Sequence, residues 1–280
     1  MGLYSVCTVF VQCLYSVCTV FVKCCCTHCF GHLFSLLPFV FSSSLCVLFP
    51  PAVLDKTTQR HYALKLMSRT YIVDNGWEEM VEHERRAMME LAGVSIFLID
   101  LYNTYCDKHY IYMLMELCTG GELYEHLCQQ EHKSVSVGAM RFYSGCIFEG
   151  ISTMHSYNIV YRDLKPENVI LDESGYAKLV DYGLAKKTMR TYTVCGTPEY
   201  MAPEQVLSRG HDSGVDYWAL GVMMYEMITG FTPFVGYDQM EIYGTSCKWW
   251  WWWCICVCCF VGCLVGHCWL ILESCGCSVF

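Results

Sequence analysis

Residues 158–172 read NIVYRDLKPENVILD, and this stretch is the strongest indication of the fold. It holds three carboxylates, two amides, an arginine and a lysine, set among apolar residues that can anchor a loop in a core. Transfer of a phosphoryl group to a hydroxyl needs an oriented acceptor, a divalent metal and positive charge near the transferred group. Residues 158–186 contain side chains suited to all three tasks.

The segment YRDLKPEN (161–168) resembles the catalytic loop of protein kinases. The resemblance implies that Asp163 accepts the proton of the substrate hydroxyl, that Lys165 lies near the γ-phosphate and that Asn168 is a metal ligand. Tyr161 stands where most kinases have a histidine, a variant that is seen in the AGC group.

The segment DYG (181–183) resembles the kinase motif that follows the catalytic loop, which implies that Asp181 is the second metal ligand. Tyr182 replaces the usual phenylalanine, and we expect the ring packing to survive this change. A single Asp or Lys in a loop is more often a solvated or turn-forming residue. The ordered series of motifs, rather than any one residue, therefore carries the resemblance.

Upstream, HYALKLM (61–67) alternates like a strand and resembles the kinase strand that carries the ATP-binding lysine, here Lys65, with Ala63 also against the nucleotide. The segment EEMVEHERRAMMEL (78–91) has helical spacing. Glu84 is the preferred partner for Lys65, and the nearby helix acids Glu82 and Glu90 are its rivals.

The segment IYMLMELCTGGEL (111–123) resembles the kinase strand and hinge that hold adenine. The resemblance implies that Met115 guards the back of the pocket and that the backbone of Glu116 and Cys118 meets the base. Apolar strand residues are otherwise core by default, so only the hinge assignment is functional.

The segment RTYTVCGTPEYMAPE (190–204) resembles a kinase activation segment. Thr193 matches the threonine that is phosphorylated in AGC kinases, and the resemblance puts Arg162 and Lys186 where they could pair with its phosphate. Asp216, at the start of DYWALGVMMYEMITGFTPF, is expected to brace the catalytic loop.

Three segments most resemble cGMP-dependent protein kinases and are nearly as similar to cAMP-dependent kinases: YMLMELCTGGEL, GYAKLVDYGLAKK and GHDSGVDYWALGVMMYEMITG. The resemblance covers about residues 55–243, and no cyclic-nucleotide-binding module is recognised in the sequence. Glu122, Glu167 and Glu226 match the acids that read arginines before the target residue in that group. Because carboxylates take Arg in bidentate pairs, we expect protein substrates with basic residues before the acceptor, although solvated surface acids are the alternative.

The two ends differ from the middle. Residues 1–54 have one charged side chain and eight of the 22 cysteines, and contain an eleven-residue duplication (3–13 and 14–24). Residues 247–280 have two charged side chains and nine cysteines. We interpret both as low-complexity segments. Residues 249–272 are uncharged and long enough to span a bilayer, so membrane association is the alternative, and zinc binding at CCCTHCFGH (24–32) is a third.

The 192 residues from 55 to 246 hold 16 Lys/Arg against 26 Asp/Glu, a balance that argues against nucleic acid as a partner. Their five cysteines show no paired spacing, which favours a reducing compartment, so we expect a cytoplasmic protein.

The sequence departs from the kinase pattern in two places. Residues 42–64, before Lys65, contain no glycine, although the family has a Gly-rich loop there that covers the phosphates. No arginine follows Arg209, so we expect Glu204 to lack its usual partner. These departures leave open a catalytically impaired pseudokinase or truncated interaction module.

We therefore predict an α+β, two-lobed protein-kinase-like fold that is truncated, with the first strands of the sheet and the last helices missing. The β-rich N-lobe is expected at about 55–117 and the mainly helical C-lobe at about 118–246, between the end segments 1–54 and 247–280. The predicted activity is phosphorylation of Ser/Thr, with ATP and Mg²⁺ as cofactors.

Overall fold

The computed structural model describes residues 7–14, 17–24, 34–36, 52–55 and 58–248, and the first three of these segments are described by their backbone alone. The chain divides into two compact units. We call Met1–Val81 with Ile99–Cys118 the sheet unit, and Glu82–Leu98 with Thr119–Phe280 the helical unit. A β-rich unit and a mainly helical unit confirm the predicted α+β class.

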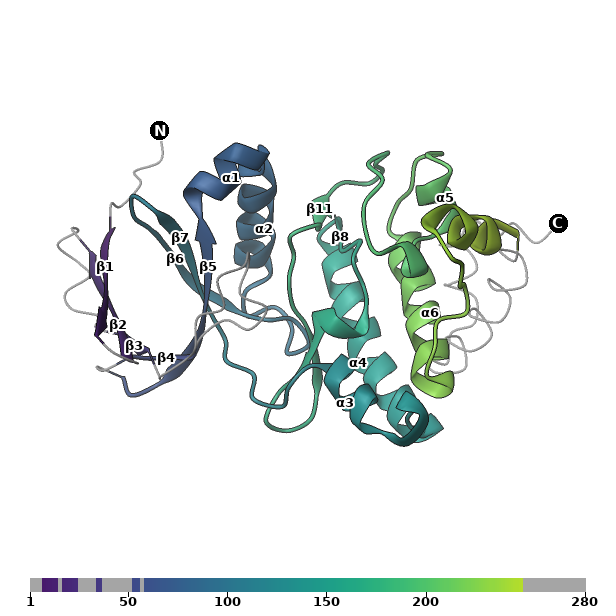
Figure 1. Cartoon of the computed structure of the whole chain (residues 1–280), viewed down its shortest axis with the longest axis horizontal. Helices are drawn as coiled ribbons and strands as arrows, with labels where there is room; N and C mark the ends of the chain where they lie inside the picture. The colour runs from purple at the N-terminus through teal and green to yellow at the C-terminus, as the bar shows by residue number, and fades with distance from the viewer. Residues whose placement is uncertain (1–6, 15–16, 25–33, 37–51, 56–57, 249–280) are drawn as a thin grey trace. The chain divides into compact units, whose positions relative to one another are not determined.

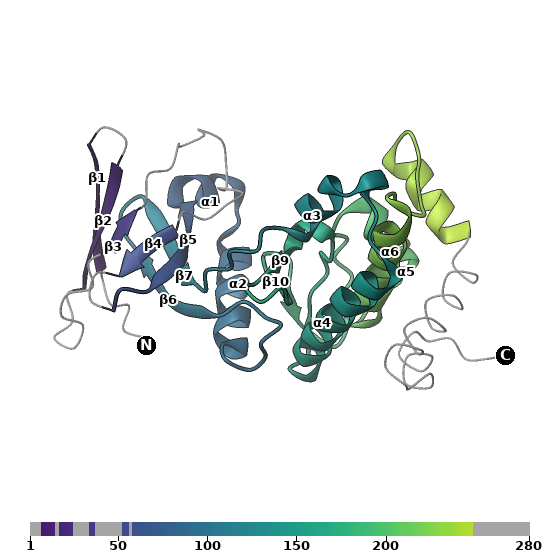
Figure 2. The same ribbon diagram turned by 90° about the horizontal axis from the view of Figure 1, so that it is seen from below.

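The sheet unit contains a five-stranded sheet whose neighbours all pair antiparallel, in the order β3-β4-β5-β7-β6 (Figure 2). Its strands are β3 (Phe34–Leu36), β4 (Ala52–Asp55), β5 (His61–Ser68), β6 (Leu101–Cys106) and β7 (Tyr110–Met115). The expectation that the first strands are missing is wrong. Strands β3 and β4 precede the lysine strand β5, because the alternating segment Ala52–Asp55 pairs with it.

Alternation along β5 and β7 sorts side chains onto two faces. Val53, Leu64, Tyr112 and Leu114 form a buried apolar cluster on one face. Since successive residues of a strand point to opposite faces, Lys65 belongs to the other face. The apolar cluster thus fixes the register that presents Lys65.

Two helices follow the lysine strand. Helix α1 (Arg69–Asn75) begins after Ser68, whose Oγ accepts the Tyr71 N–H at 3.4 Å, and ends at Gly76, which has φ 66°. Helix α2 (Glu78–Leu91) has the bounds of the segment whose spacing predicts a helix. It begins in the sheet unit and ends in the helical unit.

The helical unit is built around α4 (Val137–Ser156) and α6 (Gly214–Thr229), which lie against one another (Figure 1). Ile147, Ile151 and Met154 of α4 are fully buried, as are Val222 and Met223 of α6. The unit also contains α3 (Leu123–Gln129), α5 (Pro203–Val206) and a helix over 239–248. Burial of apolar faces on long helices gives the loops between them a rigid base.

Short strands and 3-10 turns frame those loops. Strand β8 (Ile159–Val160) pairs with β11 (Lys186–Lys187), and β9 (Val169–Leu171) pairs with β10 (Ala177–Leu179). The 3-10 turns are η1 (Glu131–Lys133), η2 (Pro166–Asn168) and η3 (Pro198–Tyr200).

The duplicated segment near the N-terminus forms a hairpin of β1 (Cys7–Leu14) and β2 (Val17–Cys24), in which Cys7 lies opposite Cys24. The proposed membrane span at 249–272 and most of the proposed zinc segment at 24–32 lie outside the described residues. In the part of the chain that is described, no helix is both long and apolar enough to cross a membrane, and no group of three His, Cys, Asp or Glu residues could hold a metal ion.

Candidate functional site

Asp216 holds the start of the catalytic loop. Its carboxylate accepts the backbone N–H groups of Tyr161 and Arg162, each at 2.8 Å, and its side chain is almost fully buried. Arg162 has φ 70°, a left-handed conformation that is uncommon outside glycine. The two hydrogen bonds stabilise this bend, so the predicted bracing role of Asp216 is confirmed.

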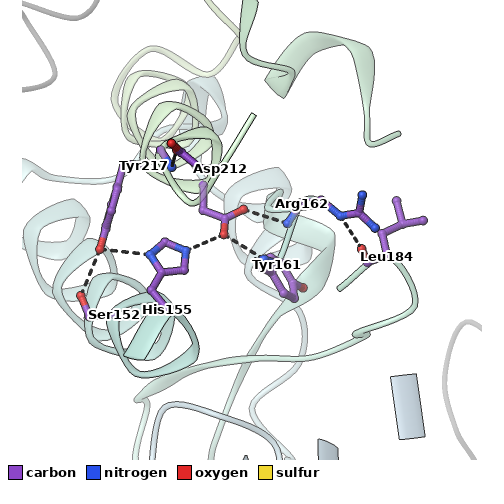
Figure 3. A network of polar contacts seen from close by, with 9 residues as sticks. Ser152, His155, Tyr161, Arg162, Leu184, Asp212 and Tyr217 are labelled. Carbon is purple, nitrogen blue, oxygen red and sulfur yellow. Dashed lines mark hydrogen bonds and ion pairs between the residues drawn. The ribbon is translucent and has the colours of Figure 1, made fainter. Parts of the chain in front are cut away.

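A histidine on α4 supports the same carboxylate. His155 Nε2 lies 2.7 Å from Asp216 Oδ2, and its Nδ1 lies 3.3 Å from the Tyr217 hydroxyl, which in turn contacts Ser152 (Figure 3). The sequence interpretation missed His155. It is 61 residues from Asp216, and no motif joins the two.

Asp163 is the centre of a second polar group. Its Oδ2 accepts a hydrogen bond from Asn168 Nδ2 at 2.8 Å and forms an ion pair with Lys165 Nζ at 3.0 Å. Its Oδ1 accepts a hydrogen bond from Thr197 Oγ1 at 3.0 Å. The structure therefore brings together the three catalytic-loop residues that the sequence singled out, with the Asp163 carboxylate fixed from both sides.

Thr197 is a site residue that the sequence interpretation left unassigned. Its hydroxyl also lies 3.1 Å from Lys165 Nζ, so it joins the lysine and the aspartate. It follows Gly196, which has φ 114° and lies so close to the Arg162 carbonyl that an added Cβ would come within 2.8 Å of it. Gly196 was the sequence feature that could have pointed to Thr197, because a glycine is required where the backbone lies this close to the catalytic loop.

The oxygen atoms of Asn168 and Asp181 fit a divalent cation. Asn168 Nδ2 donates to the Asp163 carbonyl and carboxylate, both at 2.8 Å, so Oδ1 is the atom offered to a metal. The Val180 N–H donates to the Asn168 carbonyl at 3.0 Å, which brings the residue before Asp181 beside Asn168. Amide and carboxylate oxygens are ligands that Mg²⁺ prefers, so the residues fit the cofactor.

The two tyrosines that replace the usual residues pack together. The Tyr161 and Tyr182 rings meet edge to face, with centroids 6.0 Å apart, and both side chains are fully buried. The Tyr161 hydroxyl donates to the Val180 carbonyl. The expectation that ring packing survives the substitution in DYG is confirmed.

Three residues of the sheet unit that are predicted to contact the nucleotide, Ala63, Lys65 and Met115, share one face of the sheet. Ala63 lies opposite Met115 in the β5/β7 register, and Lys65 lies opposite Met113, two positions along. The Glu116 N–H donates to the Asp100 carbonyl at 2.9 Å, which fixes the start of the hinge. Cys118, the other predicted hinge contact, is half-buried at the end of the sheet unit.

Helix α2 separates the preferred glutamate from its rivals. Glu84 is buried, with 3% of its surface exposed. Glu82 accepts hydrogen bonds from Arg85 and Arg86, and Glu90 pairs with Lys187. Pairing of Glu84 with Lys65 stays a prediction.

The predicted substrate acids interact electrostatically. Burial raises the pKa of Glu226, and the charge of Glu167 raises it further, while a hydrogen bond from the Tyr200 hydroxyl acts in the opposite direction. Burial also raises the pKa of Glu122, with added effects of Glu125 and Glu167. The three acids therefore form one negative cluster in the helical unit, with Glu167 common to both interactions.

The activation segment places Thr193 near basic residues. Its side chain is exposed, and its Oγ1 lies 3.4 Å from Thr191 Oγ1, which Lys186 Nζ also contacts at 3.4 Å. The Arg162 Nε donates to the Leu184 carbonyl at 2.8 Å, whereas its Nη1 is buried without a hydrogen-bond partner among the described residues.

Glu204 is half-buried, and burial raises its pKa, with a further contribution from Asp212. Within the described part of the chain no ion pair of Glu204 is found, and the expected lack of its arginine partner stays a prediction.

Comparisons with known proteins agree with this geometry. Residues 51–249 match the family described as protein kinase domain. The chain is 46% identical over 194 residues to the cGMP-dependent protein kinase isozyme 2 forms cD5/T2 of Drosophila melanogaster, which covers 68% of this chain and 20% of that protein. For human cGMP-dependent protein kinase 2 the identity is 46% over 190 residues, covering 67% and 24%. For the cGMP-dependent protein kinase egl-4 of Caenorhabditis elegans it is 45% over 185 residues, covering 65% and 23%. The chain thus spans about a quarter or less of the length of these relatives.

Proposed function

The chain belongs to the protein kinase domain family, and we propose from this premise that it is a Ser/Thr kinase that transfers the γ-phosphoryl group of ATP to protein substrates. The observation that supports this most directly is the Asp163 carboxylate, which Asn168, Lys165 and Thr197 hold in one orientation. A carboxylate fixed on both oxygens is suited to orient a hydroxyl for attack.

Each residue of the proposed site has its own role in the transfer. When bound, Mg²⁺-ATP supplies the phosphoryl group and the charge that the metal neutralises. Asn168 and Asp181 would hold the metal, Lys65 would bind the phosphates, and Ala63, Met115 and the hinge at Glu116 and Cys118 would hold the base. Asp163 positions the acceptor hydroxyl and accepts its proton. Lys165 places a positive charge beside the same carboxylate.

We further propose that the substrates carry basic residues before the acceptor. The charge of Glu167 raises the pKa of both Glu122 and Glu226, and an arginine side chain relieves this repulsion by pairing with the carboxylates. The cluster therefore favours a cationic peptide over a neutral one.

Phosphorylation of Thr193 is proposed as the control of this activity. A phosphate on Thr193 would lie near Lys186, which contacts the neighbouring Thr191. The Arg162 side chain contacts the Leu184 carbonyl, ahead of the activation segment. A phosphate there orders the segment that carries Thr197.

The direct test is transfer of labelled phosphate from Mg²⁺-ATP by the purified full chain to a peptide with arginines before its serine. We expect transfer by the wild type and a large loss in Asp163→Asn, which keeps the size of the side chain. A matched peptide with alanines in place of the arginines should be a poorer substrate. Equal transfer by wild type and Asp163→Asn contradicts the proposal.

A second candidate is a non-catalytic interaction module. Residues 37–51, which connect β3 to β4, contain no glycine, so the backbone cover that kinases place over the phosphates is not encoded there. A folded chain that binds Mg²⁺-ATP or partner peptides but transfers no phosphate in the same assay supports this candidate.

A further inference from the structure

His211 is a buried histidine that the proposed catalytic residues do not use. Only 2% of its surface is exposed, and neither ring nitrogen has a hydrogen-bond partner among the described residues. Buried polar groups are nearly always hydrogen-bonded, so each exception calls for an explanation. Arg162 Nη1, in the same region of the helical unit, is a second buried donor without a partner there.

The backbone ties His211 to the activation segment. His211 and Thr191 exchange both of their backbone hydrogen bonds, each at 2.8 Å, as a directly opposed antiparallel pair. Side chains of such a pair lie on the same face. Thr191 Oγ1 is 3.4 Å from the Thr193 hydroxyl and 3.4 Å from Lys186 Nζ, so the His211 ring lies beside this polar group.

The surroundings of the His211 ring favour its neutral form in the unmodified chain. Burial lowers the pKa of His211, and the charges of Arg162 and Lys186 lower it further. Asp216 and Asp212 act in the opposite direction without reversing the shift. Two cations therefore act on the His211 ring, and one of them, Lys186, contacts the threonine next but one to the exposed Thr193.

We propose that His211 is the third cationic ligand of a phosphate carried by Thr193, and that it takes up a proton from solvent when that phosphate is present. This inference rests on the proposed function, which makes Thr193 the phosphorylated residue. The protonated imidazole has two N–H donors in place of one, and the phosphate oxygens accept from His211, Arg162 and Lys186. Proton uptake and phosphate binding strengthen each other, because linkage is reciprocal.

Protonation of His211 should affect the stability of the unmodified and the phosphorylated chain in opposite directions. In the unmodified chain the pKa of His211 lies below that of an unfolded histidine, so stability is lost as the pH falls through about 6.5. With the phosphate present the pKa rises, so His211 contributes stability at low pH and loses that contribution as the pH rises. The increase in unfolding temperature on phosphorylation should therefore be larger at pH 6.5 than at pH 8.

The test uses the full chain with phosphothreonine incorporated at position 193 during synthesis, so that the result does not depend on kinase activity. Proton NMR follows the titration midpoint of the His211 ring, with the exposed His132 as an internal control. We expect the His211 midpoint to shift to higher pH in the phosphorylated chain and the His132 midpoint to stay unchanged. Equal His211 midpoints in the two forms overturn the inference.

His211→Gln supplies an independent measurement, since glutamine donates a hydrogen bond but does not titrate. We expect the gain in unfolding temperature on phosphorylation to become independent of pH in this variant. A gain that is already independent of pH in the wild type overturns the inference, even where the glutamine variant fails to fold. A phosphorylated chain that shows the His211 shift but transfers no phosphate contradicts the proposed function and leaves this inference standing.

Discussion

Thr197→Ala tests how much the fixed orientation of the Asp163 carboxylate contributes to catalysis, because the substitution leaves Asp163 itself unchanged. The change removes the donor to Asp163 Oδ1 at 3.0 Å and the contact with Lys165 Nζ at 3.1 Å. The Asp163 and Lys165 side chains are 12% and 23% exposed, so water replaces the lost contacts only in part. The carboxylate stays in place but is free to rotate.

A hydrogen bond to a charged group is worth about 1.5 to 3 kcal/mol. Each step of about 1.4 kcal/mol in the activation free energy changes a rate tenfold. We therefore expect kcat for peptide phosphorylation at saturating Mg²⁺-ATP to fall about 10-fold to 100-fold in Thr197→Ala. The KM for ATP should change little, because among the described residues the Thr197 hydroxyl contacts Asp163 and Lys165 and not the residues assigned to the base or the metal.

Thr197→Ser is the matched control, since it keeps the hydroxyl and removes only a methyl group. We expect its kcat to stay within a few-fold of the wild type. The reasoning is refuted if Thr197→Ala keeps the wild-type kcat, or if the serine variant is as slow as the alanine variant while both remain folded by thermal unfolding.

Three further substitutions test other parts of the account. Glu226→Gln should raise the KM for an arginine-containing peptide about tenfold or more, with kcat unchanged. Because burial raises the pKa of Glu226 above the usual 4.5, the wild type should begin to lose affinity for this peptide at a pH above 4.5 as the pH falls. The glutamine variant should lack this pH dependence. Because an acid with a raised pKa destabilises the fold when ionised, the same variant should unfold at neutral pH no more easily than the wild type. Asp216→Asn should lower the free energy of unfolding by about 1 to 3 kcal/mol, measured with urea, because one backbone N–H then faces an amide donor; a wild-type denaturation curve contradicts this. Gly196→Ala should cost about 1 to 3 kcal/mol by the same method, since φ 114° and the nearby Arg162 carbonyl exclude a Cβ. Gly145→Ala in α4, with open space at its Cβ, is the control and should not destabilise the chain, because alanine favours a helix interior.

The sequence predicted the parts of the fold that are encoded in continuous motifs. The helix at 78–91 and the lysine strand are local patterns of apolar spacing, and the loop around Asp163 is one unbroken segment. The α+β class follows from the same motifs through the family resemblance.

Residues that act through tertiary contacts were harder to find. Thr197 reaches Asp163 from 34 residues away, and His155 reaches Asp216 from 61 residues away. The left-handed backbone of Arg162 and Asp181 has no signature in residue type, because neither is glycine. The presence of β3 and β4 was missed because a four-residue strand becomes recognisable only through its pairing with β5.

The central claim is that Lys65, Asp163, Asn168 and Asp181 serve one nucleotide. A crystal structure of the full chain with Mg²⁺ and a non-hydrolysable ATP analogue tests it most directly. The account predicts one metal ion about 2.1 Å from Asn168 Oδ1 and from an Asp181 carboxylate oxygen, with Lys65 Nζ on the phosphates of the same nucleotide. A nucleotide bound elsewhere, or these four side chains on separate surfaces, would contradict it.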